Sequence, residues 1–126
     1  MRIDHIALWT HDLERLRAFY ELYFGAVAGP RYQNPHKQFS SYFLRFDSGA
    51  RVELMQRPAL GLAANGPAAG YAHLAVAVGS ESGVDQLTAR LARDGYAVLD
   101  GPRRTGDGYY ESVVADPDGN HIEITV

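Results

Sequence analysis

Two histidines and two glutamates occupy matching places in the two halves of this chain. His5 and Glu53 lie in the first half, His73 and Glu123 lie in the second, and the two separations are nearly equal. Imidazole nitrogens and carboxylate oxygens are good ligands for divalent Zn, Ni, Co, Mn and Fe. A duplicated unit that brings these four side chains together therefore predicts one metal ion held between the two halves.

The segments around these residues are repeated as well. DHIAL at residues 4–8 recurs as AHLAV at 72–76, and RVEL at 51–54 recurs as HIEI at 121–124. A glycine also precedes each glutamate by four positions, so that turn and strand are duplicated together. One structural unit, used twice, is therefore expected.

Each half is predicted to contain a strand, a helix and three further strands. Apolar spacing and capping residues place the helices after Asp12 and after Ser80 or Ser82, and Gly25 and Gly95 are placed to end them. The expected strands cover residues 3–9, 27–32, 39–46, 51–56, 71–78, 96–99, 109–115 and 121–126, with polar loops at 34–37 and 101–108. The chain is thus predicted to be an α+β protein of two tandem βαβββ modules, 1–57 and 71–126, joined by a connector at 58–70.

The two-residue period of a strand determines which side chains share a face. His5 shares its face with Ala7, whereas Ile6 and Leu8 point the other way, and the other three strands follow the same rule. A single polar residue in such a position is ordinarily a solvated side chain. Four of them on equivalent strands, often beside alanine, favour a metal site with room for a ligand.

Composition limits the possible partners. The chain has 126 residues, enough for one domain, a formal charge of −3 and no basic tract, so that a nucleic-acid partner is not expected. Apolar runs are too short to span a membrane, and the N-terminus shows no apolar signal segment. The chain has no cysteine, so that any metal must be held by nitrogen and oxygen, and a reducing cytoplasm is the expected location.

The whole chain resembles the vicinal oxygen chelate superfamily, which includes glyoxalase I, fosfomycin-modifying enzymes, extradiol dioxygenases and bleomycin-binding proteins. The most specific segments are DHIALW at 4–9, GYAHLA at 70–75 and DPDGNHIE at 116–123. The resemblance implies an incompletely closed eight-stranded cup around a metal held by one His and one Glu from each half. It also implies a homodimer, with each site formed within one chain or shared between two.

The ligand quartet resembles that of glyoxalases and certain epimerases. This implies a lyase or isomerase that acts on a small oxygenated or thiol-conjugated substrate by proton transfer next to a metal-bound oxygen. Glu123 is the first candidate for the general base and Glu53 the second, whereas His5 and His73 serve only as ligands. Weaker candidates for substrate binding are Tyr109, Tyr110, Arg103 and Trp9.

Three other functions remain open for the same scaffold. The cup could bind a drug or metabolite without turnover. It could add a thiol to an epoxide antibiotic, as fosfomycin enzymes do, or cleave catechol rings, as extradiol dioxygenases do. Members with the last two activities typically use two His and one Glu, and the bleomycin-binding relatives generally lack the ligands.

Overall fold

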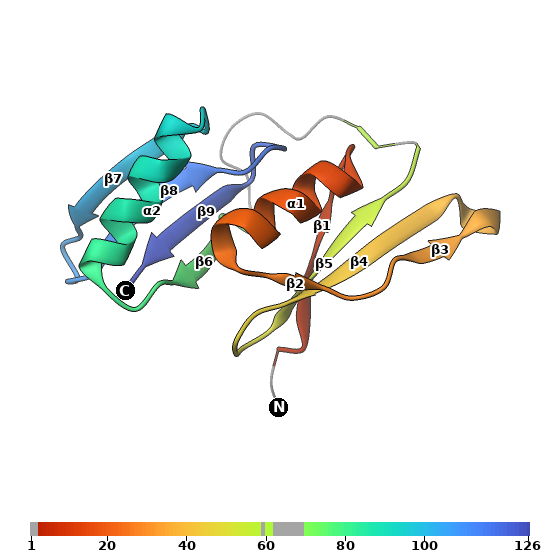
Figure 1. The fold of residues 1–126 in the computed structure, drawn as a ribbon, viewed down its shortest axis with the longest axis horizontal. Coiled ribbons are helices and arrows are strands. Elements are labelled where there is room, and N and C mark those ends of the chain that lie inside the picture. Colours follow the sequence, from red (N-terminus) through yellow and green to blue (C-terminus); the bar gives the residue numbers. More distant parts are fainter. Residues whose placement is uncertain (1–2, 59, 62–69) are drawn as a thin grey trace. The chain divides into compact units, whose positions relative to one another are not determined.

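The computed structural model describes residues 3–58, 60–61 and 70–126 (Figure 1). The chain divides into two compact units, residues 1–63 and 64–126. Within the predicted connector, residues 59 and 62–69 lie outside the described part. No helix in the described part of the chain is long and apolar enough to cross a bilayer.

The first unit contains a five-stranded sheet in the order β1-β5-β4-β2, with β3 also paired to β4. Its elements are β1 (His5–Trp9), α1 (Leu13–Phe24), β2 (Val27–Ala28), β3 (Tyr32–Asn34), the 3₁₀ turn η1 (Pro35–Lys37), β4 (Phe39–Arg45) and β5 (Arg51–Gln56). The single strand predicted at 27–32 is therefore two short strands. Pro30 lies between them, and a proline cannot donate a hydrogen bond to a neighbouring strand. The predicted loop at 34–37 forms the 3₁₀ turn, which Asn34 caps.

The second unit repeats this arrangement in a four-stranded sheet, in the order β6-β9-β8-β7. Its elements are β6 (Leu74–Ala77), α2 (Glu81–Arg93), β7 (Val98–Arg104), β8 (Tyr110–Ala115) and β9 (His121–Thr125). The strand predicted at 96–99 begins at Val98 and continues to Arg104, into the predicted loop at 101–108. It does so because β7 stays paired with β8 across two shifts of register. The α+β class with two βαβββ modules is confirmed.

Each helix begins and ends at the predicted residues or next to them. The Asp12 side chain accepts a hydrogen bond from the Arg15 N–H at 3.0 Å, and Gly25 closes α1 with a positive φ of 62°. Ser80, rather than Ser82, caps α2 by accepting a hydrogen bond from the Gly83 N–H at 3.1 Å. Side-chain caps of this kind satisfy N–H groups that the first helical turn leaves unpaired.

The buried stripe of α2 contains a polar residue that its apolar spacing did not indicate. Leu87 is only partly buried, whereas Thr88 is 3% exposed. The Thr88 hydroxyl lies 2.6 Å from the Val84 carbonyl oxygen and 2.6 Å from the Ser112 hydroxyl. Because these contacts satisfy its hydrogen-bonding capacity, the hydroxyl is tolerated under the helix.

Both sheets bury one face beneath a helix (Figure 1). Helix α1 contacts β2, β4 and β5, and α2 contacts β7, β8 and β9. The strand residues buried on these faces are even-numbered: Leu44, Val52, Leu54, Val114, Ile122 and Ile124. Side chains alternate along a strand. Outside β7, whose register shifts, the odd-numbered residues therefore belong to the faces that the helices do not cover, and all four predicted ligands are among them.

The turn before β9 is built around the carboxylate of Asp116. Its Oδ1 accepts hydrogen bonds from the N–H groups of Asp118 and Asn120, both at 2.9 Å, and its Oδ2 accepts one from the Asn120 side chain at 2.8 Å. Asp116 is 4% exposed, and this burial raises the pKa of its carboxyl above the ordinary value. The carboxylate thus fixes the start of the strand that carries Glu123.

Gly101 allows a close approach between β7 and β8. Its φ is +74°, and an added Cβ would lie 2.6 Å from the Glu111 carbonyl oxygen. We predict that Gly101→Ala lowers the free energy of unfolding, measured in urea, by at least about 2 kcal/mol. Gly106→Ala is the matched control, because its Cβ would meet nothing within 4 Å. Equal losses in both variants would contradict this account of the hairpin.

Replacing Asp116 tests the turn. We predict that Asp116→Ala lowers the free energy of unfolding by about 1–3 kcal/mol, because buried N–H donors lose their acceptor.

The raised pKa of Asp116 means that the folded protein binds more protons than the unfolded chain, so that the contribution of Asp116 to the free energy of unfolding falls as pH rises through the raised pKa. Urea unfolding at several mildly acidic pH values should show this fall in the free energy of unfolding for the parent and for an Asp107→Ala control. The fall should be absent in Asp116→Ala.

Candidate metal centre

The first and last strands of each unit are parallel neighbours, and this pairing brings a histidine to a glutamate. In the first unit β1 pairs with β5, and Ala7 lies opposite Glu53. In the second unit β6 pairs with β9, and Ala75 lies opposite Glu123. Each histidine is two residues before the alanine. It therefore belongs to the same face as the glutamate, one step away along the neighbouring strand.

The side chains within each unit approach each other through the atoms that metals bind. His5 Nε2 lies 4.0 Å from Glu53 Oε2, and His73 Nε2 lies 3.4 Å from Glu123 Oε2. Two donor atoms about 2.1 Å from a common ion are about 3.0–3.4 Å apart, depending on the angle between them. The second distance fits this range and the first is slightly longer.

The four predicted ligands thus form two His–Glu pairs, one in each unit. The glutamate side chains are 15% and 18% exposed, whereas the histidines are 39% and 43% exposed. No group of three or more potential ligands is found among the residues that the structure describes. Each pair supplies one imidazole nitrogen and one carboxylate oxygen, and this donor set suits divalent metals of borderline softness.

Aromatic rings surround the pair in the first unit. Phe43 lies opposite Glu53 on β4, and its ring meets the His5 ring edge-on, with centroids 5.2 Å apart. Trp9, which shares this face, is 42% exposed; its ring lies edge-on to Phe39, with centroids 6.2 Å apart. The guanidinium of Arg57 lies 4.6 Å from the centre of the indole. The face that carries Glu53 therefore also carries three aromatic side chains, those of Phe43, Trp9 and Phe39.

The carboxylate of Asp4 contacts the first histidine from the side opposite Glu53. Asp4 Oδ2 lies 3.0 Å from His5 Nδ1 and also contacts the Arg51 guanidinium. The hydrogen bond with His5, followed by that with Arg51, lowers the pKa of the Asp4 carboxyl to about 2. Asp4 was not singled out from the sequence; the signal was its position directly before the candidate ligand.

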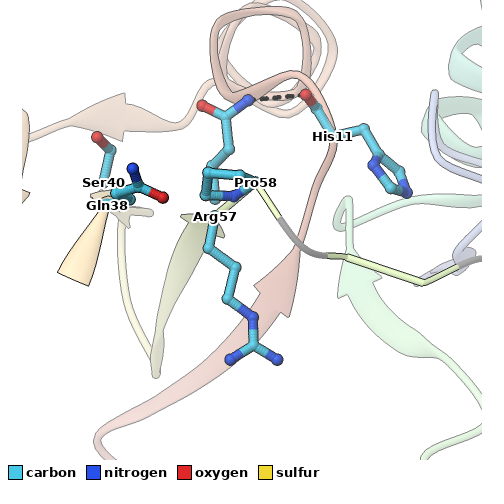
Figure 2. Close-up of a pocket in the computed structure, with 6 residues that line it drawn as sticks. His11, Gln38, Ser40, Arg57 and Pro58 are labelled. Atoms are coloured by element: carbon cyan, nitrogen blue, oxygen red, sulfur yellow. Dashed lines mark hydrogen bonds between the residues drawn. The ribbon is translucent and has the colours of Figure 1, made fainter.

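A pocket of about 240 Å³ lies elsewhere in the first unit. Its lining residues are His11, Gln38, Ser40, Gln56, Arg57 and Pro58 (Figure 2). The Gln56 side chain donates a hydrogen bond to the His11 carbonyl oxygen at 2.7 Å, the contact dashed in Figure 2. None of the predicted ligands lines this pocket, and it touches the predicted site residues only through Arg57, which lies over Trp9.

In the second unit, a buried glutamate shares the face of Glu123. Val113 lies opposite Glu123, so Glu111, two residues earlier on β8, belongs to the same face and is only 9% exposed. Arg103 lies opposite Glu111 on β7, with Nη2 3.6 Å from Glu111 Oε1 and 2.6 Å from Asp100 Oδ2. Glu111 was not predicted from the sequence, because its place beside Glu123 depends on the register of β8 and β9.

Arg103 is held in place by acidic neighbours. Its hydrogen bond with Asp100 raises the pKa of the guanidinium, and the negative charges of Glu111 and Glu123 add to this effect. Arg103 and Glu111 thus lie together on the uncovered face of the second sheet, which is also the face of Glu123.

The two tyrosines next to β8 differ in position. Tyr110 donates a hydrogen bond from its hydroxyl to Asp85 on α2 at 2.7 Å, and this bond raises the pKa of the tyrosine. Its side chain therefore lies on the helix-covered side, opposite Glu111 and Glu123. Tyr109 precedes the strand and is 58% exposed. Of the four weaker candidates, Arg103 and Trp9 lie on the faces that carry the glutamates.

Comparison with known proteins identifies the family. A model of the Glyoxalase/Bleomycin resistance protein/Dioxygenase superfamily matches residues 2–124. The uncharacterised protein YqjT of Bacillus subtilis is 31% identical over 97% of this chain and 96% of its own length.

Solved structures share the fold. Glyoxalase I from Zea mays matches 98% of this chain with a TM-score of 0.80 and 22% identity, and the match spans only 44% of the maize chain. A possible glyoxalase from Bacillus cereus matches 100% of this chain and 99% of its own length, with a TM-score of 0.72 and 28% identity. The resemblance inferred from the sequence is confirmed: the chain belongs to the Glyoxalase/Bleomycin resistance protein/Dioxygenase superfamily.

Proposed function

We propose that this protein is a metal-dependent lyase or isomerase of the glyoxalase type, acting on a small oxygenated or thiol-conjugated substrate. Its metal ligands are His5, Glu53, His73 and Glu123. The observation that carries the proposal is that each unit separately directs a histidine Nε2 toward a glutamate Oε2, at 4.0 Å and 3.4 Å. Chance pairing of solvated side chains would not be expected at equivalent places in both units.

The donor chemistry fits a single divalent ion shared by both pairs. Each pair alone supplies only two ligands, and sites in proteins usually draw three or four from the chain. The proposal therefore requires that the two pairs meet, within one chain or across a homodimer. Zn, Ni, Co, Mn and Fe all accept two imidazoles and two carboxylates. When bound, the metal would act as a Lewis acid that polarises substrate oxygens. Four protein ligands would leave coordination positions open for those oxygens if the metal takes five or six ligands.

Glu123 is proposed as the general base. The residues opposite it on the neighbouring strands are Ala75 and Val113, whose side chains donate no hydrogen bond to the carboxylate. The carboxylate would take the proton from a hydroxyl-bearing carbon next to a carbonyl and return it to the carbonyl carbon, while the hydroxyl proton passes to the former carbonyl oxygen. This transfer is an isomerisation with no net redox change, and it needs no oxidant or reductant; a thiol is needed only to form a thiol-conjugated substrate. Glu53 has the equivalent position and is the second candidate.

Substrate contacts are proposed for two residues on the glutamate-bearing faces. Arg103, held by Asp100 and Glu111, presents donors on the face that carries Glu123. Trp9 presents an exposed ring on the face of Glu53. A homodimer in the cytoplasm is the proposed setting, and family membership supports the dimer.

Metal content and turnover test the function together. We predict about one divalent ion per chain by elemental analysis, and conversion of methylglyoxal in the presence of at least one of several thiols. Removing the metal with a chelator should abolish turnover, and adding Ni, Zn or Co should restore it. Metal-independent ligand binding without turnover would instead indicate a binding module. A requirement for oxygen with Fe or Mn would indicate a dioxygenase.

Replacing the proposed base gives a sharper test. We predict that Glu123→Gln lowers kcat at least about 100-fold while circular dichroism shows an unchanged fold, because the amide keeps the shape but cannot take the proton. Glu81→Gln is the control: this exposed carboxylate of the same unit pairs with Arg104 on the helix side. Full turnover by Glu123→Gln would transfer the role to Glu53 or remove glyoxalase-type chemistry from consideration.

A further inference from the structure

The ring of His5 is held through the nitrogen that the proposed metal does not use. Its Nδ1 lies 3.0 Å from Asp4 Oδ2, and its Nε2 is the atom 4.0 Å from Glu53. An ionised carboxylate can only accept hydrogen bonds. A hydrogen bond at this distance therefore requires the proton on Nδ1, which leaves the Nε2 lone pair directed toward Glu53.

The carboxylate of Asp4 is itself anchored. It contacts the Arg51 guanidinium, and the Arg51 backbone N–H donates a hydrogen bond to the Asp4 carbonyl oxygen at 3.0 Å. The same guanidinium lies 4.5 Å from the centre of the Phe43 ring, which contacts the imidazole edge-on. Arg51 lies opposite His5 in the parallel register of β1 and β5. Arg51, Asp4 and His5 are therefore joined by a series of side-chain contacts.

The second unit has the same backbone arrangement, but the residues at the equivalent positions cannot form this series of contacts. Ala72 precedes His73, and its methyl group accepts no hydrogen bond. His121 takes the place of Arg51 at the start of the last strand. The two proposed histidine ligands thus differ in their support, although their strands and glutamates are equivalent.

We infer that Asp4 is a positioning residue that fixes His5 in its Nδ1–H tautomer, with Nε2 available as a metal ligand beside Glu53. Histidine ligands in metal sites commonly donate their other N–H to a carboxylate, which orients the ring and makes the bound nitrogen a better donor. The inference rests on the proposed function for the metal, although the tautomer itself does not require one. It assigns the first half the more firmly oriented histidine.

Tautomers can be measured directly on the metal-free protein. Long-range ¹⁵N–¹H correlation spectra of the imidazole rings, recorded in alkaline buffer where histidine is neutral, identify the protonated nitrogen. We expect His5 as the Nδ1–H form in the parent, and a shift toward the Nε2–H form in Asp4→Ala. This variant gives the first half the alanine that the second half already has. His73 serves as an internal reference whose signals should not change.

A matched variant distinguishes the loss of the Asp4–His5 hydrogen bond from the loss of one negative charge on the surface. Glu14→Gln also removes an exposed carboxylate of the first unit that contacts arginines, and Glu14 and Asp4 are 48% and 51% exposed. It should leave the His5 tautomer unchanged. Zinc titrations of the parent and both variants should show about tenfold weaker binding in Asp4→Ala only.

The outcomes distinguish this inference from the proposed function. An Nε2–H tautomer in the parent, or no change in Asp4→Ala, would overturn the positioning role. A changed tautomer with unchanged zinc affinity would overturn it too, while leaving the metal site intact. If the parent shows the Nδ1–H form, controlled by Asp4, but binds no divalent metal, then the proposed function fails and the assignment of the hydrogen bond stands.

Discussion

The parallel pairing of the first and last strands in each unit is the constraint on which the candidate site depends. It places Ala7 opposite Glu53 and Ala75 opposite Glu123, which puts each histidine on the same face as a glutamate. A slip of one residue would turn every side chain of the last strand to the other face. The buried side chains of Val52 and Ile122, which lie under the helices, oppose such a slip. Hydrophobic burial thus fixes the register that brings the polar side chains together.

The two units share this framework but differ in the charged residues around it. In the first, Asp4 contacts the Nδ1 of His5 and is itself contacted by Arg51, and the ring of Phe43 lies edge-on to the imidazole. In the second, Arg103 pairs with Asp100 and Glu111 on the face that carries Glu123. A carboxylate therefore supports the histidine of the first half, whereas the second half carries the Arg103–Glu111 ion pair on the face of its glutamate. A duplicated backbone has acquired two different environments.

Much of this could be predicted from the sequence because it depends on local periodicity. The two-residue alternation around Ile122 and Ile124 located Glu123 on the uncovered face, and side-chain caps such as Asp12 located the helices. Other features depend on contacts between distant segments. Thr88 is tolerated under the helix because Ser112 contacts its hydroxyl, and the Tyr110 hydroxyl finds its acceptor in Asp85 on α2. The roles of Asp4 and Glu111 likewise required strand registers, which single residues do not reveal.

The central claim is that both His–Glu pairs hold the same ion, and a zinc-loaded crystal tests it most directly. Anomalous scattering at the zinc edge locates the metal without assuming its ligands. The account predicts one strong peak per chain, bonded to one His–Glu pair from each half of the sequence, from the same chain or from two chains. Separate peaks at each pair, or a peak bonded to other residues, would contradict it.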